Sequence, residues 1–198
     1  MPLIETENLR RLYHLGGETV TALGGVSLSG DEGDFVGGVG PPRPGQWMDP
    51  GALGSLGVGT GFAIAAGLAH PDKEVLCYYG DGAFSMTAFD METANRFNVP
   101  YIAVVGNNSA MNQIRYGQLA KYGEERGNVG NLRSDVPFGR FAEMLGGYGE
   151  EVRDPAMIAP ALQRAREAVQ KTGRSAVINI WVDPGVYAPG TMAQTMYK

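Results

Sequence analysis

Hydrophobic positions from about residue 54 onward change repeatedly between a strand-like and a helix-like spacing. Short apolar runs predict buried strands at 74–79, 101–105, 149–152 and 175–182. Apolar positions at helical spacing predict helices at 54–69, 87–97, 138–145 and 155–171. A strand, a helix and a second strand in this order favour parallel pairing, because a parallel connection needs a long crossover. The pattern therefore predicts an α/β fold with an open, mainly parallel sheet and helices on both faces.

Turn residues follow two of the predicted strands. Gly80-Asp81-Gly82 comes directly after the first strand, and Asn107-Asn108 comes shortly after the second. In open α/β sheets, ligands bind beyond the carboxyl ends of the strands, where such loops meet. We therefore expect the two turns to face the same ligand.

The residues of the two turns suit a magnesium ion that carries a diphosphate. Magnesium prefers six oxygen ligands and usually takes few of them from the protein. Asp81 offers a carboxylate, Asn108 an amide oxygen and Ala110 a backbone carbonyl. Gly80 and Gly82 allow the backbone to approach phosphate closely. Backbone amides that open the following helices favour anions, and those expected here belong to Gly82, Ala83, Phe84, Asn108, Ala110 and Met111.

The motifs together resemble a known family. Asn108 stands 27 positions after Asp81, and upstream the loop Gly54-Ser55-Leu56-Gly57 precedes the first helix. From about residue 45 to its end, the chain resembles the cofactor-binding C-terminal domain of thiamine diphosphate-dependent enzymes. It is most similar to the acetolactate synthase group, which includes the 2-hydroxyacyl-CoA lyases. The resemblance implies cofactor contacts from Gly54 and from Leu56, which matches the apolar residue that bends the cofactor.

This resemblance implies a carbon–carbon lyase or synthase that acts on 2-oxo acids or 2-hydroxyacyl-CoA compounds. The implied cofactors are thiamine diphosphate and Mg²⁺. In the family, a catalytic glutamate comes from a separate pyrimidine-binding domain, for which 198 residues leave no room. We therefore expect no catalytic residue in this chain, and a pyrimidine-binding domain or subunit as partner in a homo- or hetero-oligomer. The alternative is a truncated or fused module that keeps the fold without catalysis.

The first forty or so residues depart from this family. They resemble the opening of an ABC transporter ATPase subunit, whose phosphate loop carries a lysine and a hydroxyl residue. Gln46 and Trp47 stand in their place, and Pro42 and Pro44 remove amide donors, so ATP binding is disfavoured. The segment is either a fusion remnant or a β-rich extension. The predicted organisation is an N-terminal extension at 1–45, a thiamine diphosphate-binding domain at 46–184 and a tail at 185–198.

Composition and charge exclude other classes of partner. The net charge of −5 and the scarcity of Lys/Arg runs disfavour nucleic acid and anionic membrane surfaces. Apolar runs stay well short of the roughly 20 residues that cross a bilayer, and the first residues lack the pattern of a signal peptide. We expect a cytoplasmic protein with a small-molecule substrate. The single cysteine, Cys77, excludes an internal disulfide.

Overall fold

The computed structural model describes residues 4–15, 18–30, 47–48, 50, 54–128 and 134–185, the first two ranges as backbone only. The chain divides into two compact units, Met1–Trp47 and Met48–Lys198. The predicted tail at 185–198 lies outside the described residues except for Gly185. Most of the proline-rich run at 40–47 also lies outside them.

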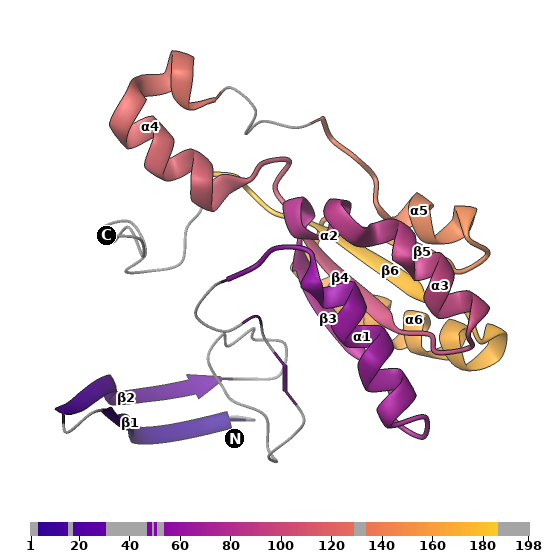
Figure 1. Ribbon diagram of the computed structural model, residues 1–198, viewed down its shortest axis with the longest axis horizontal. Helices are drawn as coiled ribbons and strands as arrows, with labels where there is room; N and C mark the ends of the chain where they lie inside the picture. The colour runs from indigo at the N-terminus through magenta and orange to yellow at the C-terminus, as the bar shows by residue number, and fades with distance from the viewer. Residues whose placement is uncertain are drawn as a thin grey trace. The chain divides into compact units, whose positions relative to one another are not determined.

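The first unit contains a β-hairpin. Strands β1 (Ile4–Leu15) and β2 (Glu18–Gly30) pair antiparallel, from Ile4 opposite Gly30 to Leu15 opposite Glu18. The register shifts three times along the pair. The hairpin forms its own two-stranded sheet, separate from the sheet of the second unit (Figure 1).

A four-stranded parallel sheet forms the centre of the second unit. Its strands are β3 (Leu76–Gly80), β4 (Ile102–Asn107), β5 (Tyr148–Val152) and β6 (Ala176–Trp181). Their order across the sheet is β3-β4-β6-β5, and every neighbouring pair is parallel. The predicted α/β fold with a parallel sheet is confirmed, with all four strands close to their predicted positions.

Helices connect these strands. They are α1 (Val58–Ala69), α2 (Asp81–Thr87), α3 (Met91–Arg96), α4 (Asn112–Gly127), α5 (Gly139–Met144) and α6 (Ile158–Thr172), with short 3-10 helices η2 (Ala88–Asp90) and η3 (Pro155–Met157). The predicted helix at 87–97 is wrong in its bounds: the helical stretch begins at Asp81 and is interrupted at Thr87. Thr87 has φ −134° and ψ 16°, which no continuous α-helix accommodates. Over the described part of the chain, no helix has the length and apolarity to cross a membrane.

The sheet buries a different core on each face (Figure 1). Helices α1, α2, α3 and α5 cover one face, where Phe84 and Met91 pack on Tyr79, Ala103 and Val105. Helix α6 covers the other face, where its small residues lie against a set of aliphatic strand residues, Ile102, Val104, Ala176 and Ile178. Helices thus lie on both faces, as predicted, and the carboxyl edge of the strands is left for loops.

Candidate functional site

The two turns singled out in the sequence emerge side by side. Tyr79 pairs with Val105 and Gly80 with Gly106 in the parallel register of β3 and β4. Neighbouring strands lie about 4.8 Å apart. The residue after Gly80 is Asp81, and Asn108 follows two residues after Gly106, so both turns start at one place on the sheet edge.

The Gly80–Gly82 turn passes straight into α2. Gly80 is the N-cap with an extended backbone, and Asp81, 3% exposed, is the first helical residue. Phe84, one turn further on, is fully buried and meets Tyr79 edge-to-face, with ring centroids 5.2 Å apart. A Cβ built on Gly80 would meet no atom within 4 Å, so there is open space beside the start of the turn.

The Asn107–Ala110 turn is held by side-chain hydrogen bonds. Asn107, 1% exposed, donates from Nδ2 to the Val136 carbonyl at 2.9 Å, and its Oδ1 accepts from the Ser109 amide at 3.0 Å. The Asn108 Oδ1 accepts from the Ala110 amide at 3.2 Å. Ser109 has a positive φ of 54°, and its Oγ lies 2.7 Å from the Asp135 carboxylate. The turn leads into α4, whose N-cap is Met111.

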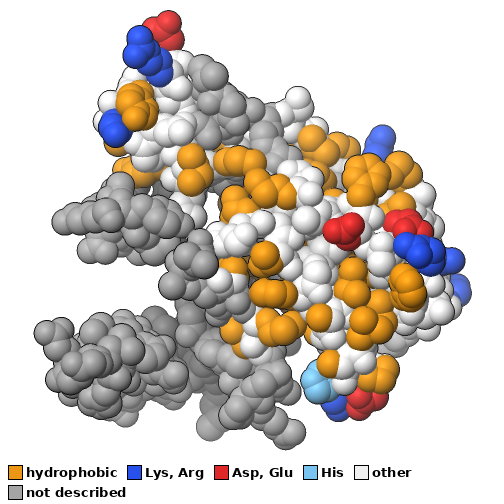
Figure 2. Space-filling view, viewed as in Figure 1, with side chains coloured by type: hydrophobic (Ala, Val, Ile, Leu, Met, Phe, Trp, Pro, Cys, Tyr) orange, Lys and Arg blue, Asp and Glu red, His pale blue; other side chains and the backbone are white. Residues whose placement is uncertain are grey.

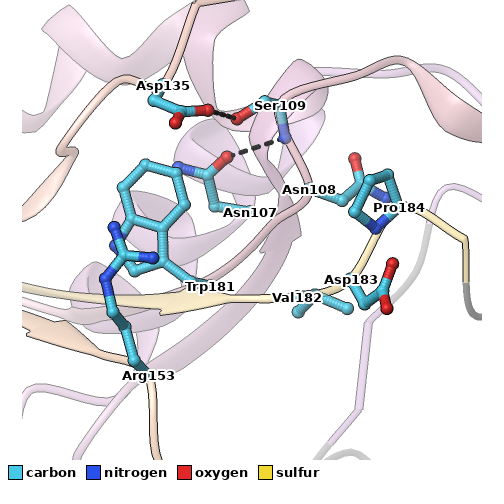
Figure 3. Close-up of a pocket in the computed structure, with 9 residues that line it drawn as sticks. All are labelled: Asn107, Asn108, Ser109, Asp135, Arg153, Trp181, Val182, Asp183 and Pro184. Atoms are coloured by element: carbon cyan, nitrogen blue, oxygen red, sulfur yellow. Dashed lines mark hydrogen bonds between the residues drawn. The ribbon is translucent and has the colours of Figure 1, made fainter.

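A pocket of about 340 Å³ opens beside this second turn (Figure 3). Arg153 lies over the Trp181 ring, 4.5 Å from its centroid, and the Trp181 indole donates to Glu151 at 2.8 Å. The lining residues come from the ends of β4, β5 and β6 and from the segment before α5: Asn107, Asn108, Ser109, Asp135, Arg153, Trp181, Val182, Asp183 and Pro184. Asn108 therefore belongs to this pocket, whereas Asp81, which follows β3, does not line it.

The loop that carries Leu56 is fixed to α2. The Thr87 hydroxyl donates to the Gly57 carbonyl at 2.7 Å and shares a hydrogen bond of 3.1 Å with the Thr60 hydroxyl. Thr60 in turn shares a hydrogen bond of 3.1 Å with the Tyr79 hydroxyl. Gly57 has φ 84°, and a Cβ there would lie 3.1 Å from the Met86 Cβ, so glycine suits this position. Leu56 itself is half exposed.

Burial keeps the hydroxyl and thiol side chains near this loop uncharged. Burial raises the pKa of Tyr79 far above its ordinary value and raises the pKa of Tyr101 to about 12. Burial likewise raises the pKa of the Cys77 thiol. These three groups therefore stay protonated at neutral pH.

Within the described ranges, no three His, Cys, Asp or Glu side chains gather as a metal site. Such a cluster is not what the predicted magnesium site requires. Of the three predicted magnesium ligands, only Asp81 is a His, Cys, Asp or Glu residue. Asn108 would contribute an amide oxygen and Ala110 a backbone carbonyl. The carboxylate and amide oxygens at this edge are donors of the kind that magnesium prefers.

Several residues that shape the site were given no role of their own by sequence reasoning, although Asn107 stood in the Asn107-Asn108 motif. Asn107 and Ser109 carry a local signal, because an Asn two residues before a Ser can cap the backbone amide that follows. No local sequence signal marks Thr87 or Asp135, because their hydrogen-bond partners lie 30 and 26 positions away in the sequence.

Comparison with known proteins agrees with this fold and site. Residues 35–180 match the family model described as thiamine pyrophosphate enzyme, C-terminal TPP binding domain. Thiamine pyrophosphate is another name for thiamine diphosphate. The chain therefore belongs to the family of thiamine diphosphate-binding C-terminal domains, and the predicted family is confirmed.

The similar proteins include acetolactate synthases and 2-hydroxyacyl-CoA lyases. The acetolactate synthase large subunit IlvG of Mycobacterium tuberculosis is 38% identical over 162 residues, which cover 81% of this chain and 28% of the relative. The 2-hydroxyacyl-CoA lyase 2 of Homo sapiens is 35% identical over 173 residues, which cover 82% of this chain and 26% of the relative. The chain thus spans little more than a quarter of the length of these relatives.

Proposed function

We propose that this chain holds the diphosphate end of thiamine diphosphate through one Mg²⁺ ion. The observation that carries the proposal is the register of Gly80 beside Gly106, because it starts both oxygen-bearing turns at one point of the sheet edge. Thiamine diphosphate supplies the chemistry that makes or breaks carbon–carbon bonds next to a carbonyl group. The residues of this chain bind and orient it.

The residues present fit the ion and its diphosphate. Asp81 supplies the charge, and the Asn108 Oδ1 keeps a second lone pair beside the one engaged by the Ala110 amide. The Ala110 carbonyl is the third proposed ligand. The open space beside Gly80 leaves room for phosphate oxygens to approach the backbone. Amides proposed to face them are those of Gly82, Ala83, Phe84, Asn108 and Met111.

Leu56 and Gly54 are proposed to contact the rest of the cofactor. Leu56 is 51% exposed on a loop that Thr87 and Gly57 fix in place, so its side chain is available to a ligand without being mobile at its base. Gly54 has φ 59°, which a residue with a side chain seldom adopts. A rigid apolar support of this kind suits a cofactor that must keep one bent conformation.

The proposed reaction class follows the relatives. Those named acetolactate synthase suggest 2-oxo acids, and those named 2-hydroxyacyl-CoA lyase suggest 2-hydroxyacyl-CoA compounds. No catalytic residue is proposed within this chain. A glutamate from a pyrimidine-binding domain, on this or another subunit, is proposed to complete the active site.

Exposed apolar side chains support such a partner. Figure 2 shows hydrophobic side chains spread over the face formed by α1, α2 and α3. Leu56, Met86 and Phe89 are exposed on or beside the elements that carry the proposed cofactor contacts. A contiguous exposed apolar patch is one feature of protein–protein interaction sites. We propose that the pyrimidine-binding partner covers it.

Calorimetry with thiamine diphosphate tests the proposal. We expect binding in the presence of Mg²⁺ and strong loss of binding when EDTA removes it, because the diphosphate charge needs the ion. Turnover of pyruvate or of a 2-hydroxyacyl-CoA should require an added pyrimidine-binding domain. Absence of Mg²⁺-dependent binding would refute the proposed site, and turnover by the chain alone would refute the need for a partner.

A further inference from the structure

We propose that Asp135 is a positioning residue for the metal-binding turn, an inference that rests on the proposed function. Its carboxylate holds Ser109, and Ser109 stands between two proposed magnesium ligands, Asn108 and Ala110. Asp135 lies in the segment before α5, far from the turn in sequence, and none of the proposed cofactor contacts comes from that segment.

The turn needs external support because Ser109 is strained. Its φ of 54° lies in the left-handed region, which is unfavourable for a residue with a side chain. Two of the hydrogen bonds that oppose this strain are local, from the Ser109 amide to Asn107 and from the Ala110 amide to Asn108. Local bonds move together with the turn and do not fix it to the sheet.

The segment at 135–136 supplies the anchor. The Ser109 hydroxyl donates to the Asp135 carboxylate at 2.7 Å, and the Asn107 Nδ2 donates to the Val136 carbonyl at 2.9 Å. Figure 3 shows the Asp135 carboxylate and the Asn107 amide both reaching Ser109. A hydrogen bond to a carboxylate is shorter and stronger than one between neutral groups. The two bonds together tie Ser109 and Asn107 to the segment before α5, and Asp135 makes the one that holds Ser109.

Orientation matters more here than at Asp81. A carboxylate is oriented by its own side-chain torsions, whereas the Ala110 carbonyl points wherever the backbone of the turn directs it. A rotation at Ser109 would redirect this carbonyl and displace the Asn108 amide together. Removing a group that orients metal ligands typically lowers metal affinity about 10- to 100-fold.

Asp183 provides a matched control. It lines the same pocket with the same charge, but its Oδ1 accepts from the Gly185 amide in its own turn, at 2.7 Å. Asp183→Ala removes one negative charge near the site and leaves the Ser109 contact intact. A comparison with Asp135→Ala therefore separates positioning from simple electrostatic attraction of the ion.

The experiment measures Mg²⁺ affinity by calorimetry on the full chain with thiamine diphosphate present. Asp135→Ala should weaken Mg²⁺ binding about 10-fold or more, and Asp183→Ala should weaken it much less. Asp135→Asn should largely restore affinity, because its amide oxygen still accepts from Ser109. Ser109→Ala should match Asp135→Ala, and the double variant should lose nothing further. Equal losses in Asp135→Ala and Asp183→Ala would overturn the inference.

A second measurement works without any ligand. In the metal-free chain, amide hydrogen exchange at Ser109 and Ala110 should be faster in Asp135→Ala than in Asp183→Ala. Equal exchange in the two variants would overturn the positioning role. A wild-type chain that binds no Mg²⁺ or cofactor would refute the proposed function, while the exchange rates would still decide whether Asp135 holds the turn. If Asp135→Ala fails to fold, Ser109→Ala removes the same contact and carries the comparison with Asp183→Ala.

Discussion

The two turns at the sheet edge are built in different ways. The Gly80–Gly82 turn enters α2 at once, and Phe84 fixes that helix by packing against Tyr79 and Phe138, at 5.2 and 5.4 Å between ring centroids. The Asn107–Ala110 turn has polar residues instead, and hydrogen bonds to the segment at 135–136 hold it. The first turn is fixed by apolar packing in the core, and the second is fixed by hydrogen bonds to a neighbouring segment.

The difference matches what each turn is proposed to supply. Hydrophobic packing has little directionality, so it can place a helix start firmly without specifying the orientation of each peptide unit. That suffices for a carboxylate with a rotatable side chain. A backbone carbonyl has no such freedom, and hydrogen bonds, which are directional, are suited to fixing it.

Phe84→Ala should have the largest effect on stability. Removing a fully buried ring that contacts three other aromatic rings should lower the free energy of unfolding by about 4 kcal/mol. Urea denaturation measures the loss. Phe97→Ala is the matched control, because Phe97 is exposed and should cost less than about 1 kcal/mol. Similar losses in the two variants would show that packing does not hold the first turn.

Asp81→Ala should have the largest effect on ligand binding. Asp81 is the only charged group among the three proposed ligands, so Mg²⁺-dependent cofactor affinity should fall more than about 100-fold, beyond the loss expected for a positioning group. Calorimetry measures this fall. Asp72→Ala removes an exposed carboxylate paired with Lys73 and should leave affinity unchanged. Wild-type affinity in Asp81→Ala would contradict the proposed metal site.

Asn107→Ala and Asn108→Ala should separate the two roles of the second turn. Asn107 is buried and makes two hydrogen bonds, so its loss should cost about 2 kcal/mol of unfolding free energy, as expected when polar partners are left unpaired. Asn108 is less deeply buried than Asn107, and its loss should mainly weaken Mg²⁺ binding. Urea denaturation and calorimetry on both variants check this. The reverse pattern would show that Asn108 is the structural residue.

The smallest effect is expected at the far edge of the sheet, where Glu150 on β5 meets Arg164 on α6 at 2.6 Å. Hydrogen bonding from Arg164 holds the pKa of Glu150 below its ordinary value of 4.5. The pair therefore stabilises the fold above about pH 4.5, and this contribution is lost as the pH falls through the lowered pKa. The pair is partly exposed, so the effect should stay below about 1 kcal/mol.

Urea denaturation of Glu150→Gln at pH 7 and near pH 3 measures this contribution. The variant should be slightly less stable than wild type at pH 7, and the two should converge in acid. Cofactor affinity should not change, since Glu150 belongs to neither turn. A difference that persists in acid would show that something other than the ionised carboxylate is responsible.

Much of the fold could be predicted from sequence because its signals are local. The apolar runs that became β3, β4, β5 and β6 show their period within a few residues. The start of α2 at Asp81 was not predicted, since Gly80 and Gly82 read as a loop when the burial of Phe84 is unknown. The same limit applies to the site: Asp81 and Asn108 belong to readable motifs, whereas Asp135 has no pattern of its own.

The sequence by itself determined which oxygen-bearing residues follow two of the strands, and through these motifs the family. The tertiary structure decided the strand order β3-β4-β6-β5, the register that sets Gly80 beside Gly106, and the contact of Asp135 with Ser109. The physical reason is the sequence separation of the residues that interact. Periodicity and turn preferences arise from neighbouring residues, whereas strand order, register and the bond from Asp135 depend on how distant segments pack once the core has formed.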